Sequence, residues 1–130
     1  MRNRIVAISL VLAVVMPAPL WALGSSLTPL VLGWEQFFKL DWQAAERGQQ
    51  SVVWGHLLND WGMPASQIQL LVEGVDTSGG VVGQKVAWLG PTLTPGTRAY
   101  FEVPVPWKAP AHRVSVFAFT WVQAGGDAFP

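Results

Sequence analysis

Short segments in which apolar and polar residues alternate, separated by residues that favour turns, recur through most of this sequence. In the segment 38–44, one parity carries only apolar side chains, at positions Phe38, Leu40, Trp42 and Ala44. The other parity carries lysine, aspartate and glutamine. Alternation with a period of two is typical of a β-strand with one buried face. This pattern predicts an all-β fold.

The alternation and the turn signals together predict further strands along the chain. They cover residues 51–58, 67–75, 81–88, 98–103 and 113–122. The turns include Asn59-Asp60, residues 76–80 and Pro95-Gly96, and Pro104 is expected to stop the fifth strand. Strands of this number and length predict an antiparallel immunoglobulin-like β-sandwich of six to seven strands.

The segment 34–47 also allows a helix. Residues 44–47, AAER, include good helix formers, and Gly48 suits the end of a helix. The alternation favours the strand. The sandwich is therefore expected over residues 34–123, with residues 23–33 as a linker or loose first strand and residues 124–130 as a flexible tail.

Residues 1–22 have the layout of a secretory signal peptide. Arg2 and Arg4 give a basic start, residues 5–16 form an apolar run, and Ala22 offers a small residue for cleavage. The run is shorter than the roughly 20 residues that a membrane-spanning helix needs. We therefore expect export to the periplasm or beyond the cell, with no membrane span after cleavage.

Removal of Arg2 and Arg4 would leave six basic and eight acidic residues. A weakly acidic chain lacks the basic surface that binds nucleic acid or anionic lipid. The sequence contains no cysteine, so disulfide bonds are excluded. The remaining chain of about 108 residues suits one domain with its own core.

The stretch VWGHLLNDWG, residues 53–62, brings a histidine, an asparagine and an aspartate together. Asn59 and Asp60 are expected in a turn, where both residue types bond their own main chain. The two histidines, His56 and His112, lack the spacing of a metal site, and no G-x-S-x-G nucleophile motif occurs. We expect no catalytic activity, no cofactor and no metal ion.

The order of several turn and packing residues resembles a known family. Gly55, Leu57 and Asn59 form a G-x-L-x-N strand, which precedes QIQLLVEGVDTSGGVVG, then Leu93-Thr94-Pro95-Gly96, then a strand containing Phe101. This order resembles the FxLYD-type domain of bacterial exported proteins, and small uncharacterised secreted proteins, over residues 50–122. The resemblance implies an immunoglobulin-like fold and an envelope domain of unknown ligand, and it brings no catalytic residues.

The second and last predicted strands carry large side chains on both faces. In the last strand, Val114 and Val116 oppose Phe117 and Phe119. A two-sheet sandwich buries only one face of each sheet, so one set is expected to face outward. If both strands lie in one sheet, a contiguous surface results. Its members are Trp54, His56, Phe117, Phe119 and Trp121.

An exposed aromatic surface predicts an interaction site. Aromatic rings stack on sugars and apolar peptides, so we expect a non-catalytic module that binds a protein or glycan partner of the cell envelope. One alternative is a structural envelope domain that acts through self-association. Another is that the N-terminal segment or a long loop covers the surface.

Overall fold

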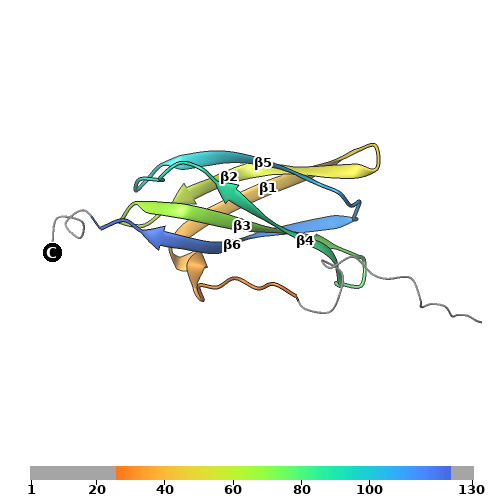
Figure 1. Cartoon of the computed structure of the whole chain (residues 1–130), viewed down its shortest axis with the longest axis horizontal. Helices are drawn as coiled ribbons and strands as arrows, with labels where there is room; N and C mark the ends of the chain where they lie inside the picture. Colours follow the sequence, from red (N-terminus) through yellow and green to blue (C-terminus); the bar gives the residue numbers. More distant parts are fainter. Residues whose placement is uncertain (1–25, 124–130) are drawn as a thin grey trace, which may run out of the picture.

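The computed structural model describes residues 26–123, which form two antiparallel sheets packed face to face (Figure 1). The first sheet has the order β1 (Phe38–Arg47), β2 (Gln50–Asn59), β5 (Arg98–Val105). The second has the order β4 (Val81–Leu89), β3 (Ala65–Val75), β6 (Ala111–Trp121). The predicted all-β sandwich is confirmed, with six strands in this part of the chain. The predicted signal peptide and tail lie outside the described residues.

The segment 34–47 is mainly a strand. A short 3-10 helix, η3 (Trp34–Gln36), precedes β1, and β1 pairs with β2 along its whole length, from Phe38 opposite Asn59 to Arg47 opposite Gln50. Gly48 has a positive φ of 62° and lies in the hairpin turn between the two strands. The cross-strand pairing therefore overrides the local helix propensity of residues 44–47.

Pro104 does not stop the fifth strand, which continues to Val105. Within the described chain β5 pairs only with β2, so it is an edge strand. Proline lacks a backbone N–H, and this is tolerated at an edge, where one side of the strand needs no ladder hydrogen bonds. The prediction that Pro104 ends the strand is therefore wrong, and the proline instead marks a sheet edge.

The core lies between the sheets and consists mostly of aliphatic side chains from alternate strand positions. The fully buried members include Val53, Leu57, Ile68, Leu70 and Val116. Burial follows a period of two along β5 and along β2 from Val53, because neighbouring residues on these strands point out of the sandwich, whereas β3 is buried on both faces.

Trp107, in the loop between β5 and β6, closes one part of the core and is only 7% exposed. Its ring packs against Gly74 of β3 and Gly83 of β4, which lie opposite each other in the second sheet. A Cβ atom on either glycine would overlap the indole. The two glycines therefore create the space that the tryptophan fills.

Residues 26–33 cross the outer face of the β4–β3–β6 sheet (Figure 1, orange segment). The backbone of Leu27 exchanges two hydrogen bonds with the Gln84 amide, and Leu30 N donates to Phe117 O over 2.8 Å. Leu71 on this outer face is fully buried. Residues 26–33 and the outer face of this sheet thus form a second, smaller packed region.

Glu73 lies on the same outer face of β3 as Leu71 and is likewise shielded from solvent, at 6% exposed. Its carboxylate accepts hydrogen bonds from Arg113 Nε over 2.9 Å and from Gln84 Nε2 over 2.8 Å. The arginine balances the charge, which makes the burial of this acid tolerable.

Candidate functional site

The predicted contiguous aromatic surface does not form, because its two strands belong to different sheets. Trp54 and His56 lie on β2 in the first sheet, while Phe117, Phe119 and Trp121 lie on β6 in the second. Of the five predicted residues, Trp54 and His56 lie on the outer face of the first sheet, and both are half-buried. The expected surface is therefore corrected to two separate sets of aromatic residues.

A break in the strand register explains why β6 carries large apolar side chains on both parities. The pairing of β3 with β6 shifts around Gln69, and Phe117 falls between the pairs made by Val116 and Ala118. Gln67, on the opposing strand, has a positive φ of 52°. An extra residue in one strand of a pair reverses which parity faces the core.

Beyond this bulge, Phe119 and Trp121 turn inward and join an aromatic cluster at one end of the sandwich. Trp121 stacks on Phe38 with ring centroids 5.9 Å apart and contacts Phe37 edge-on at 5.4 Å. Phe119 lies 4.9 Å from both Phe38 and Trp121, and Trp61 closes the cluster 4.8 Å from Phe37. These rings pack against the core, so substitutions at Trp121 would test folding and not binding.

The outer face of the β1–β2–β5 sheet presents a regular grid of side chains. Burial alternates along β5, where Phe101 and Val103 are buried and Tyr100 and Glu102 are exposed. The strand register then places outward-facing residues in four rows, each with one residue from β1, β2 and β5. The rows are Lys39–Leu58–Arg98, Asp41–His56–Tyr100, Gln43–Trp54–Glu102 and Ala45–Val52–Pro104.

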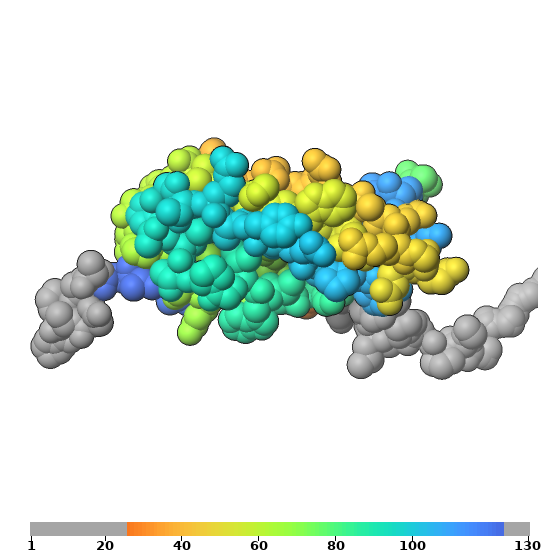
Figure 2. All heavy atoms as spheres, turned by 90° about the horizontal axis from the view of Figure 1, so that it is seen from above, coloured from red at the N-terminus to blue at the C-terminus, as the bar shows by residue number. Residues whose placement is uncertain are grey.

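Figure 2 shows the molecule from the side of this face, where atoms of β1 and β2 (orange to lime) and of β5 (cyan) lie at the surface. The central column on β2 is mostly apolar, and polar side chains flank it on both neighbouring strands. This surface, defined by the four rows, is called the grid face below.

Hydrogen bonds and ring contacts fix the side chains in the middle of the grid face. Tyr100, 54% exposed, donates its hydroxyl to Glu102 over 2.9 Å, and this bond raises the pKa of the Tyr100 hydroxyl. The His56 ring contacts the Tyr100 ring edge-on at 5.6 Å. Asp41 accepts a hydrogen bond from the backbone N–H of His56 and lies 3.5 Å from its Nδ1. These contacts hold the side chains of Asp41, His56 and Tyr100 in place relative to one another.

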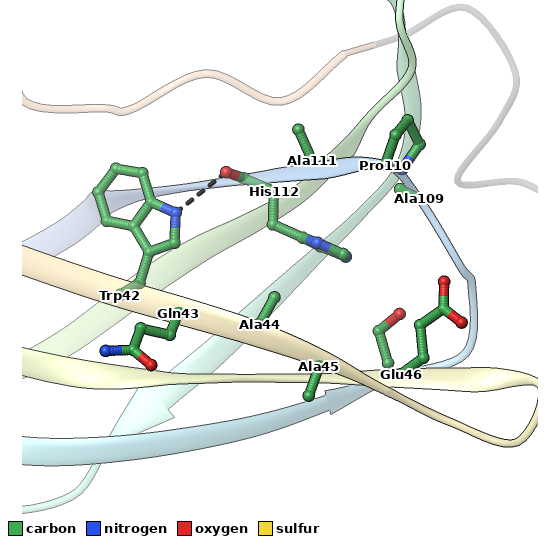
Figure 3. Close-up of a pocket in the computed structure, with 10 residues that line it drawn as sticks. Trp42, Gln43, Ala44, Ala45, Glu46, Ala109, Pro110, Ala111 and His112 are labelled. Atoms are coloured by element: carbon green, nitrogen blue, oxygen red, sulfur yellow. Dashed lines mark hydrogen bonds between the residues drawn. The ribbon is translucent and has the colours of Figure 1, made fainter.

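Two hollows lie on another side of the molecule, along the seam between β1 and β6. The larger, about 650 Å³, is bordered by residues 27–29, Trp34 and Arg113, and the smaller measures about 420 Å³. Trp42 borders both, and its indole Nε1 donates to His112 O over 3.0 Å (Figure 3). The larger hollow has two basic and two acidic side chains in its wall, so its formal charges balance.

His112, beside the smaller hollow, links pH to stability. Its Nε2 accepts a hydrogen bond from Trp107 Nε1 over 3.2 Å, which requires the neutral ring, and burial lowers the pKa of His112. The pKa of His112 is lower in the folded chain than its ordinary value of about 6.5. Between these two values the unfolded chain therefore binds the proton more readily than the folded chain. We expect the free energy of unfolding to fall as the pH drops from 6.5 towards the lowered folded-state pKa of His112.

Urea denaturation at closely spaced pH values from 7.5 to 5 measures this effect. The His112→Gln variant keeps an acceptor for Trp107 but does not titrate, so its stability should change less over the same range. Equal pH dependence in both proteins would show that His112 is not the group responsible.

The described part of the chain offers no cluster of three or more histidine, cysteine, aspartate or glutamate side chains that could hold a metal ion. Within the same residues, no helix has the length and apolar character needed to cross a membrane.

Comparisons with known proteins identify no family for this chain. The sequence matches no protein family, and no curated protein matches it. One solved structure, described as the X-ray structure of Northeast Structural Genomics Consortium target SoR45, aligns with a TM-score of 0.45 and 9% sequence identity. The alignment covers 72% of this chain and 92% of that chain.

Proposed function

We propose that this protein is an exported, non-catalytic interaction module of the bacterial cell envelope, which binds a protein or glycan partner through the grid face. The resemblance to the FxLYD-type domain is in keeping with an envelope role. The observation that supports this site is the contrast between the two outer faces. Residues 26–33 cross one of them, on which Trp88 lies exposed at the edge strand β4, whereas the other presents Trp54, His56 and Tyr100 together in adjacent rows with Tyr100 exposed.

A binding role fits the composition of the grid face. Trp54 and Tyr100 offer large contact areas with little conformational entropy to lose. Leu58 extends the apolar column beyond His56, and polar side chains surround it. Tryptophan and tyrosine are among the residue types enriched where proteins bind partners.

The Asp41–His56 pair favours binding over catalysis. The Asp41 side chain is 71% exposed and the His56 side chain 42%, and together with Lys39, Leu58 and Arg98 they border an open hollow of about 270 Å³. A general base is most effective in a cleft that excludes water and holds a nucleophile or substrate within hydrogen-bond reach. Neither a serine nor a threonine belongs to the four rows.

The Trp54→Ala variant tests the proposed surface. We expect it to weaken partner binding about tenfold or more, because an aromatic anchor at the centre of an interface dominates the binding energy. Binding of envelope extracts to the immobilised protein, followed by titration with the purified partner, measures the loss.

Trp88→Ala is the matched control, since Trp88 is 67% exposed on β4 of the other sheet. It should leave binding unchanged. Sedimentation of each protein alone distinguishes a second copy of the chain from a foreign partner. Equal binding by wild type and Trp54→Ala, with both proteins folded, would reject the grid face as the site.

A further inference from the structure

We infer that the ligand of the grid face is a glycan of at least two sugars, which stacks one ring on Trp54 and hydrogen-bonds to the side chains beside it. This inference rests on the proposed function and narrows its partner to one chemical class. It follows from the arrangement of polar side chains around the aromatic column.

The row Gln43–Trp54–Glu102 has the layout of a sugar subsite. Neighbouring strands are about 4.8 Å apart, so Gln43 and Glu102 flank Trp54 at one strand's distance on either side. A sugar ring has apolar C–H groups on its faces and hydroxyl groups around its edge. When its face covers Trp54, the hydroxyls point towards an amide that both donates and accepts, and a carboxylate that accepts.

The next row, Asp41–His56–Tyr100, provides a second subsite about 7 Å further along the strands. Here Tyr100 supplies an exposed aromatic ring and Asp41 an acceptor. The bond from Tyr100 to Glu102 and the contact with His56 hold the ring in place, which reduces the entropy cost of binding.

The same arrangement is less suited to a protein partner. The cores of protein–protein interfaces are depleted in lysine, aspartate and glutamate. On the grid face the apolar column is one strand wide, and the flanking strands carry charged residues beside it: Lys39, Asp41, Arg98 and Glu102. A protein surface would have to desolvate these charges, whereas sugar hydroxyls replace the water around them.

Binding to glycans tests the inference directly. The protein, expressed from its full-length sequence and purified, is applied to a glycan array and sedimented with peptidoglycan sacculi, chitin and cellulose. We expect the wild type to bind at least one of these, Trp54→Ala to bind it about tenfold more weakly, and Trp88→Ala to bind it as the wild type does. Glu102→Gln, which keeps an acceptor for Tyr100 but loses the charge, should bind a few-fold more weakly.

Circular dichroism and thermal unfolding confirm that each variant is folded. If the wild type binds no glycan but retains a protein partner that Trp54→Ala loses, the glycan inference is wrong and the proposed binding face stands. If glycan binding persists unchanged in Trp54→Ala, the site lies elsewhere and both are overturned. If the wild type binds neither class, both are likewise overturned.

Discussion

Replacing Trp107 by alanine should lower the free energy of unfolding by about 4 kcal/mol, the range found for large buried aromatic side chains. The ring is 7% exposed and fills the space left by Gly74 and Gly83. The substitution removes this packing and the hydrogen bond to His112. Because the two glycines have no side chains that can move into the space, the cavity would persist.

Urea denaturation followed by circular dichroism measures the change. Trp88→Ala is the control for loss of an indole, and at 67% exposure it should shift the stability by less than about 0.5 kcal/mol. If the two variants were destabilised to the same extent, Trp107 would not be part of the core. A Trp107→Phe variant should recover part of the loss, since it restores ring packing without the N–H donor.

Asn59→Ala should lower the free energy of unfolding by about 3 kcal/mol, because it removes the side chain that joins two loops. Asn59 is fully buried at the end of β2. Its Nδ2 donates to Met63 O and Leu93 O, each over 2.8 Å, and its Oδ1 accepts from Trp61 N over 2.9 Å. Alanine would leave Met63 O and Trp61 N without this partner in a region with little access for water, while Leu93 O would keep its hydrogen bond from Ala65 N.

The neighbouring Asp60→Ala variant is the control. Asp60 is exposed and forms only a loose ion pair with Lys39 at 4.0 Å, so its loss should cost less than about 1 kcal/mol. Asn59→Asp keeps the acceptor oxygen but places a second oxygen against two carbonyls, and it should be destabilised as well. A stable Asn59→Ala protein would contradict the joining role.

Local patterns were sufficient to predict the strands. Alternation in residues 98–103 identifies faces that the structure buries and exposes accordingly, whereas in residues 38–44 only Phe38 and Leu40 are shielded and Trp42 and Ala44 are exposed. In the turn at residues 76–80, Asp76 accepts hydrogen bonds from Ser78 and Gly80, as its residue types indicate. These features depend on neighbours in the chain, which is why one sequence is enough to find them.

The candidate site was predicted only in part. Trp54 and His56 face outward as expected, but their supposed partners on β6 lie in the other sheet, and sheet membership depends on contacts between distant segments. The bulge at Phe117 has a signal in the sequence, because the large apolar side chains switch from positions 114 and 116 to positions 117, 119 and 121, but this switch was interpreted as two apolar faces. Tyr100 was missed, although its parity with Arg98 and Glu102 placed it on the solvent side of β5.

The hydrogen bonds at the rims of the two sheets restrict how copies of this protein can associate. At β6, the carbonyls of His112 and Phe117 already accept hydrogen bonds from Trp42 and Leu30. At β5, Pro104 offers no N–H, and its carbonyl accepts from Lys85. Another chain that added a strand at these rims would find these carbonyls occupied and one N–H missing, so strand addition is hindered at those positions.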